Sequence, residues 1–151
     1  MTFNEVLVRR NIITKVILDN GNKSLSKELK VKIMRMRIAY NKIKKAFDDD
    51  VKEFVDQIVP EECKQLSRLS ERTEKQDKRL AELSAEINAE YNEFVAQKSA
   101  EELSDVIDDK ITEEEYAEIV DVNSASDVDI NGQQLNAADF LEILYTLFVE
   151  E

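Results

Sequence analysis

This chain of 151 residues contains no histidine and no tryptophan. It has two glycines, one proline and one cysteine. Without histidine there is no Ser-His or Cys-His nucleophile and no imidazole ligand for a metal. The two glycines, Gly21 and Gly132, stand alone, so no glycine-rich loop exists to hold phosphates. Cys63 has no partner thiol for a disulfide or a zinc site, which fits a reducing compartment. The sequence therefore predicts no enzyme activity and no cofactor.

Long apolar runs are also missing. None approaches the roughly 20 residues needed to cross a bilayer, and the first residues lack the apolar stretch and cleavage site of a signal peptide. We therefore expect a chain that stays in the cytoplasm and has no membrane partner. Because glycine and proline are so scarce, the elements should be few and long, and 42% hydrophobic with 36% charged residues is typical of a helical bundle or coiled coil.

Charge is distributed unevenly along this acidic chain, whose net charge is −12. Residues 1–47 carry twelve Lys and Arg against three Asp and Glu, whereas residues 101–151 carry one Lys against sixteen acids. Such a chain can neutralise itself by folding its tail onto its first helices, or by meeting a neighbouring copy head to tail. The basic side chains of the predicted long helix could contact nucleic acid, but the overall charge favours a solvated face that partly pairs with the acidic third.

Apolar residues recur every three or four positions from Leu25 to Ile58 and predict one long amphipathic helix. At ~1.5 Å per residue it would span about 50 Å, so its apolar stripe should lie against another long helix. Ser24 or Ser26 would cap this helix, and it would end before Pro60. Ahead of it, Asn4 would cap a first helix that stops near Gly21; strands in the β-branched parts of that segment are the alternative.

A period close to that of a coiled coil follows Pro60 and predicts the return arm of a long antiparallel helical hairpin. The polar residues 70–79 interrupt it, either as a solvated stretch of helix or as a break that would leave two shorter helices and a compact bundle. We expect one stripe to pack on the other, with Met36, Tyr40, Ile43 and Phe47 on one side and Leu80, Leu83, Ile87 and Phe94 on the other.

The acidic last third predicts a small α+β cap. Thr112 and Glu115 form a capping box for a short helix through Val120. Residues 128–130 and 133–135 are typical of two strands about a tight Asn-Gly turn, and Asn136 would cap a last helix. That helix is so apolar that we expect it to be buried in its own core or in a partner, through Phe140, Leu144, Leu147 and Phe148. The predicted fold class is thus mostly α, with residues 1–100 as the hairpin and its N-terminal helix and residues 101–151 as the cap.

One motif in the cap has possible metal chemistry. Asp127, Asp129, Asn131 and Gly132 resemble the opening of an EF-hand calcium loop, and the following residues resemble its close and a dockerin repeat. However, the twelfth position is Ala138, and Asp139 arrives one residue late, which removes the bidentate ligand that closes the coordination sphere. We therefore prefer a hairpin and a capped helix without metal, and keep a degenerate calcium site as an alternative.

The order of these parts resembles that of a family of small tailed-phage proteins of unknown function. The resemblance is carried by the N-terminal apolar helix (residues 3–17), the long Lys-rich helix, the Glu-rich helix around residues 92–94, and the acidic end with residues 111–116 and 135–141. It implies a viral origin, a location in the host cytoplasm or the virion, and a protein–protein role.

Together these features predict a non-enzymatic interaction or assembly protein whose apolar faces dock against its own copies or against another protein. The alternative is a viral anti-defence protein that holds a small nucleotide signal between helices. That function would need some of Arg9, Arg10, Arg35 and Arg37 to point into a cavity.

Overall fold

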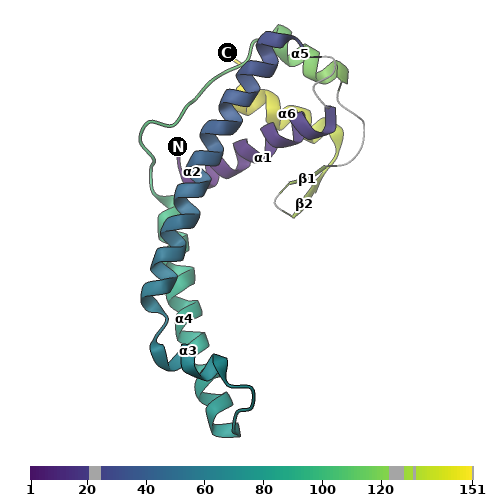
Figure 1. Cartoon of the computed structure of the whole chain (residues 1–151). Helices are drawn as coiled ribbons and strands as arrows, with labels where there is room; N and C mark the ends of the chain where they lie inside the picture. Colours follow the sequence, from purple (N-terminus) through teal and green to yellow (C-terminus); the bar gives the residue numbers. More distant parts are fainter. Residues whose placement is uncertain (21–24, 123–127, 131, 151) are drawn as a thin grey trace. The chain divides into compact units, whose positions relative to one another are not determined.

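The computed structural model describes residues 1–20, 25–122, 128–130 and 132–150, and the protein is mostly α, as predicted. The elements in these ranges are α1 (Phe3–Asn20), α2 (Lys27–Ile58), α3 (Glu61–Arg68), α4 (Glu74–Ala100), α5 (Glu113–Val122), β1 (Val128–Ile130), β2 (Gln133–Leu135) and α6 (Ala137–Phe148) (Figure 1). None of these helices is both long and apolar enough to span a membrane.

The chain divides into two compact units. The first unit contains Met1–Lys44 and Glu102–Glu151, and the second contains Lys45–Glu101, so that helix α2 contributes to both. The division differs from the predicted one, in which residues 1–100 form one body. Of the two boundaries between the units, only the one near residue 101 was predicted. The boundary at Lys44 was not predicted, because the apolar stripe of α2 continues through it without interruption.

The first unit holds most of the core. Helices α1 and α6 lie side by side, and the first half of α2 and helix α5 complete the layer around them (Figure 1). The largest side chains with almost no exposed surface are Ile12, Ile13, Leu29, Ile33, Met36, Tyr40, Ile111, Ile119, Phe140, Leu144 and Phe148. They recur at helical spacing in α1, α2 and α6, so burial of one face of each helix supplies the driving force for this unit.

Capping residues explain where most helices begin. Helix α1 is capped by Thr2 and not by Asn4, since the Thr2 hydroxyl accepts from the Glu5 amide (3.3 Å) and the Glu5 carboxylate accepts from the Thr2 amide (2.6 Å). Ser26 caps α2 by accepting from the Leu29 amide (3.3 Å), which was one of the two predicted caps. Ser24, the other, lies outside the described residues.

The two predicted caps of the C-terminal segment are confirmed. Thr112 and Glu115 make a reciprocal capping box at α5, with both amide bonds at 3.1 Å, and the Asn136 side chain accepts from the Asp139 amide (2.8 Å) at the start of α6. The two strands are also confirmed and pair antiparallel, Val128 with Leu135 and Ile130 with Gln133. Gly132 in their turn has φ +77°, which a residue without Cβ adopts at little cost.

The second unit folds back on itself at a polar turn. Helix α3 ends at Arg68, and α4 starts after Thr73, whose hydroxyl and amide form a capping box with Gln76. Residues 69–73 therefore break the helix, whereas residues 74–79 belong to α4, so each of the two interpretations of residues 70–79 holds for part of that stretch. The polar residues form the turn and the cap of α4, so the chain reverses its direction here. The junction at Pro60, by contrast, only divides α2 from α3.

Candidate functional site

The acidic tail neutralises the basic N-terminal helices within the first unit. Arg9 pairs with Asp108 (3.0 Å), Lys32 with Glu115 (2.6 Å), and the N-terminal amine with Glu102 (2.6 Å). Arg35 approaches Asp109 at 4.0 Å, and the Ser26 hydroxyl donates to Glu118 (3.0 Å). Self-neutralisation through the tail, one of the two predicted outcomes of the charge asymmetry, is thus observed.

The Lys32–Glu115 pair is the most enclosed of these contacts. Burial by itself would raise the pKa of Glu115, but the hydrogen bond from Lys32 and the capping bonds at Thr112 outweigh it and hold the pKa below its ordinary value of 4.5. A carboxylate whose pKa is lowered on folding stabilises the protein above that ordinary value, and the contribution disappears as the pH falls through the folded pKa.

Replacing Glu115 by Gln is therefore expected to lower the free energy of unfolding by about 1–2 kcal/mol at pH 7, through loss of a charge-assisted bond. The difference between the two proteins should shrink as the pH falls below 4.5 and through the lowered pKa of Glu115, because the wild-type carboxylate then becomes protonated. Urea unfolding across this pH range measures it. Glu114→Gln, one residue away and exposed, is the control; equal behaviour of the two variants would contradict the assignment.

Several of the residues predicted to pack in the hairpin or through the terminal helix are buried together in the first unit. Met36 and Tyr40 have no exposed surface and belong to the same cluster as Phe140, Leu144 and Phe148, so their predicted packing against α4 is wrong. Burial also raises the pKa of Tyr40, whose hydroxyl lies 3.5 Å from the Ile107 carbonyl. The terminal helix is thus buried in its own core, which was one of the two predicted outcomes.

The other predicted contact residues keep accessible surface or lie in the second unit. Ile43 packs at the edge of the first unit's core, and Leu147 lines a groove on its surface. Phe47, Leu80, Leu83, Ile87 and Phe94 belong to the second unit, where Leu83 is buried and the other four are half-buried.

An apolar seam runs through the second unit between α4 and the limb formed by α2 and α3. Phe54 stacks on Phe94 with ring centroids 4.0 Å apart, and Lys98 pairs with Asp50 (2.9 Å) while lying 6.0 Å from the centroids of Phe47 and Phe94. Nearer the turn, Arg79 pairs with Glu62 (2.9 Å), so the two limbs run antiparallel. We define the seam by its half-buried side chains Val51, Phe54, Val55, Ile58, Leu66, Leu80, Ile87, Phe94 and Val95.

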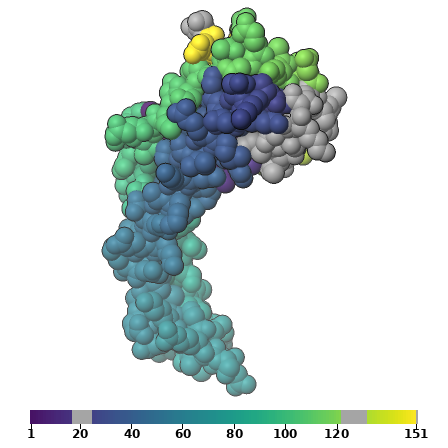
Figure 2. Space-filling view, turned by 45° about the horizontal axis from the view of Figure 1, so that its top comes forward, coloured from purple at the N-terminus to yellow at the C-terminus, as the bar shows by residue number. Residues whose placement is uncertain are grey.

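The outer side of α2 in the first unit carries a second, unexpected apolar row. Val31, Met34 and Ile38 are 54%, 38% and 50% exposed, and they follow one another at helical spacing on the side away from the core. This half of α2 lies open on the face drawn in Figure 2, in dark blue. We define the basic face as this row with Lys27, Lys30, Arg35 and Lys42, each of which lies one turn from a member of the row. The spacing was visible in the sequence, but the stronger buried stripe obscured it.

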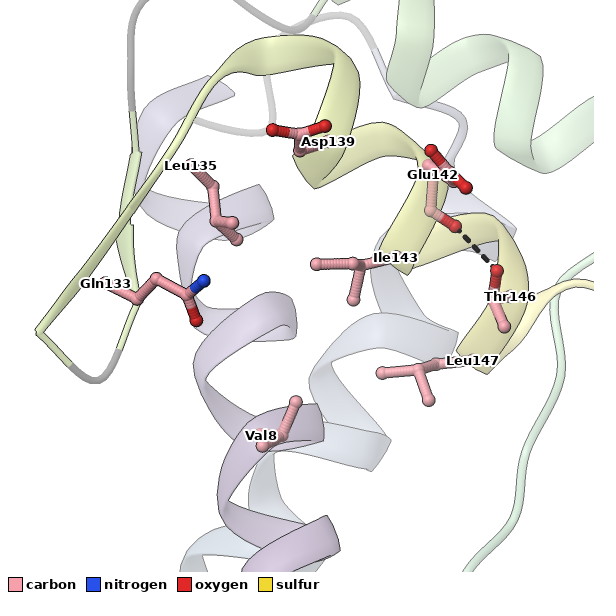
Figure 3. A pocket seen from close by; sticks show the side chains of 8 residues that line it. All are labelled: Val8, Gln133, Leu135, Asp139, Glu142, Ile143, Thr146 and Leu147. Carbon is pink, nitrogen blue, oxygen red and sulfur yellow. Dashed lines mark hydrogen bonds between the residues drawn. The ribbon is translucent and has the colours of Figure 1, made fainter.

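A groove of about 550 Å³ lies between α1, β2 and α6. Figure 3 shows Val8, Leu135, Ile143 and Leu147 pointing toward a common centre, with Asp139 and Glu142 along the border that α6 provides. A neighbouring hollow of about 250 Å³ shares Val8 and Leu147 and adds Glu5 and Arg9. We define the two hollows together as the acidic groove. Its apolar floor and charged border suit a peptide segment better than a polar metabolite.

The four arginines of the nucleotide alternative do not converge on one of the hollows described here. Arg9 is held by Asp108 and lies 5.3 Å from the Phe148 ring centroid, Arg10 donates to Asn41 (2.6 Å), and Arg35 borders a different hollow of about 370 Å³ on α2. Arg37 lines none of these hollows, and its Nε is buried with no hydrogen-bond partner among the residues that the structure describes.

The calcium candidates are not assembled in the described part of the chain. Asp127 and Asn131 lie outside the described residues, as does the side chain of Asp129, whereas Asp139 is exposed at the border of the acidic groove. Among the described residues, no group of three or more metal-ligating side chains comes together.

Comparison with protein families, with curated proteins and with solved structures finds no match for the chain. The seam, the basic face and the acidic groove are therefore the features of the molecule that bear on its function.

Proposed function

We propose that this protein is a non-enzymatic assembly protein that associates with a second copy of itself through the seam of the second unit. The observation that carries the proposal is the poor burial of this unit. Among the buried hydrophobic residues of the described chain, Cys63 and Leu83 alone belong to residues 45–101. The remaining apolar side chains of the seam are half-buried, and Leu69 and Tyr91 nearby are 41% and 38% exposed.

A seam between two helical limbs is open on both flanks, because each limb covers only one side of the other. Burial of apolar surface contributes roughly 25 cal/mol per Å², so nine half-buried side chains represent substantial unused stabilisation. Small helical units commonly obtain the missing burial by association, and two hairpins that face each other form a four-helix bundle. A second copy supplies a surface with the same length and spacing.

Charge favours an antiparallel arrangement of the two copies. Residues 60–80, the turn end, contain six Lys and Arg against five acids, a net charge of +1. Residues 45–59 with 81–101, the open end, contain three against ten, a net charge of −7. A parallel pair would place the two open ends together, whereas an antiparallel pair places each beside a turn end. The expected dimer is thus two-fold symmetric.

As part of this proposal, the resemblance to tailed-phage proteins suggests the host cytoplasm or the virion as the setting. An interaction through apolar side chains is compatible with the high negative charge, which keeps copies apart elsewhere.

Light scattering during size-exclusion chromatography tests the association. We expect the wild type to reach twice the chain mass of 17.4 kDa and the variant Leu69→Glu/Tyr91→Glu to remain at that mass. Both positions are exposed in the single chain, so the variant should keep its helix content by circular dichroism. Added salt should strengthen the dimer, because the second units each carry −6. A wild type that stays monomeric at every concentration would end the proposal.

A further inference from the structure

We infer that the acidic groove of one copy binds the basic face of α2 of a second copy. Both surfaces belong to the first unit, so this contact is separate from the seam. The two are complementary in two respects, namely charge and apolar pattern.

The charges at the border of the groove are free to meet a partner. Asp139 and Glu142 form no ion pair with a residue of the described chain, whereas four other carboxylates of residues 102–150 lie within 4.0 Å of a cation of the first unit. Glu5, at the far end of the groove, keeps a lowered pKa through its bonds with Thr2 and so is ionised at neutral pH. Since Arg9, the cation of the groove, is paired with Asp108, the groove presents negative charge around an apolar floor.

The basic face has the opposite character. Lys27, Lys30 and Lys42 form no ion pair in the part of the chain that the structure describes, and Arg35 only approaches Asp109, at 4.0 Å. Lys32, which points to the other side of the helix, is by contrast paired with Glu115. Self-neutralisation by the acidic tail therefore leaves cations unpaired on one side of the first unit and carboxylates unpaired on another.

The apolar patterns also fit. Val31, Met34 and Ile38 form a row of about 10 Å along one side of a helix, which is the usual pattern of a helix that lies in a groove. In the acidic groove, the shared side chains Val8 and Leu147 join two hollows of about 550 and 250 Å³. The row would cover Val8, Ile143 and Leu147, while the flanking lysines reach the carboxylates on the border.

The occupant must come from another molecule. The opposite side of this part of α2 buries Ile33, Met36 and Tyr40 in the core that also contains α1 and α6. The basic face therefore cannot enter the groove of its own chain without unfolding the unit. Since the two surfaces differ, the contact is heterologous, and its repetition from copy to copy extends an assembly. The proposed seam contact would in addition join the copies of that assembly in pairs.

The contact is tested by reversing charges on each surface in separate variants and then mixing the two variants. Both variants are made in the seam variant Leu69→Glu/Tyr91→Glu, so that association through the seam does not contribute. The groove variant is Asp139→Asn/Glu142→Lys, and the face variant is Lys27→Glu/Lys42→Glu. Analytical ultracentrifugation measures the association of each variant alone and of the two in equal mixture, at low and high salt. Lys64→Glu/Lys75→Glu, in the second unit, is the matched control.

At protein concentrations above those reached during size-exclusion chromatography, where it is monomeric, we expect the background protein to associate weakly and reversibly, and each variant alone to associate about tenfold more weakly. The mixture should recover the association, because the reversed charges of one variant meet those of the other, and salt should weaken it, opposite to its effect on the seam. The inference fails if the mixture is no stronger than either variant alone, or if the control has the same effect. If the wild type associates no more strongly than the seam variant but the mixture recovers the association, the seam is refuted and the groove contact stands.

Discussion

Met36→Ala is expected to destabilise the first unit by about 2–5 kcal/mol, whereas Met34→Ala, two residues earlier on the same helix, should change stability by less than about 0.5 kcal/mol. Met36 has no exposed surface and lies among the side chains of α1, α2 and α6, so truncation removes apolar contacts and leaves a cavity. Met34 is 38% exposed on the basic face. Alanine has a helix propensity at least as high as methionine's, so the backbone does not contribute to either loss.

The comparison uses the same substitution twice, and differences in residue type therefore cancel. Urea unfolding followed by circular dichroism gives both free energies, and the concentration should be low enough that the chain is monomeric. At higher concentration only Met34→Ala should alter association, because its side chain belongs to the proposed contact with the acidic groove. If both variants lost the same free energy of unfolding, the two sides of α2 would not differ in burial as the structure shows.

The sequence was sufficient for most elements whose cause is local. The Thr112–Glu115 box, the Asn136 cap, the two short strands and the long helix up to Ile58 all follow from residues within one turn of the feature they determine. Thr2 was missed as the cap of α1 because Asn4 is also a good capping residue two positions later. The Thr2 and Glu5 pair, spaced as in a capping box, was the signal that could have decided it.

Partners of the long apolar stripe could not be predicted, since periodicity shows which face of a helix is apolar and not what covers it. Met36 and Phe47 occupy equivalent positions on one stripe, yet the first is buried in the first unit and the second lies beside Lys98 in the second. Where a helix passes from one unit to another, only tertiary contacts define the boundary.

The candidate surfaces were predictable to different extents. The seam residues of α4 were expected to be apolar contacts, and the basic helix was recognised from its lysines. The acidic groove was not foreseen, because Val8, Leu135 and Leu147 come from three elements far apart in the chain and are ordinary apolar residues in the sequence. Their proximity to Asp139 and Glu142 depends on how α1, β2 and α6 pack.

Leu83→Ala is expected to destabilise the second unit selectively, by about 3–5 kcal/mol for the segment 45–101. Leu83 is 5% exposed and is one of two buried hydrophobic residues of this unit, so little other burial exists to compensate for the cavity. Residues 1–44 and 102–151 have their own core and should remain folded. The unfolding transition should therefore separate into two steps, with the second unit melting first.

Hydrogen exchange resolved by segment measures this outcome. Amides of α3 and α4 should exchange orders of magnitude faster in the variant, with those of α1 and α6 unchanged. At a concentration where the chain is monomeric, Leu69→Ala is the matched control, because Leu69 is 41% exposed and its truncation leaves no cavity. Raising the protein concentration should restore part of the protection in Leu83→Ala, since association through the seam stabilises the folded unit by mass action. Uniformly faster exchange across all helices would contradict the division into two units, and protection independent of concentration would contradict the seam dimer.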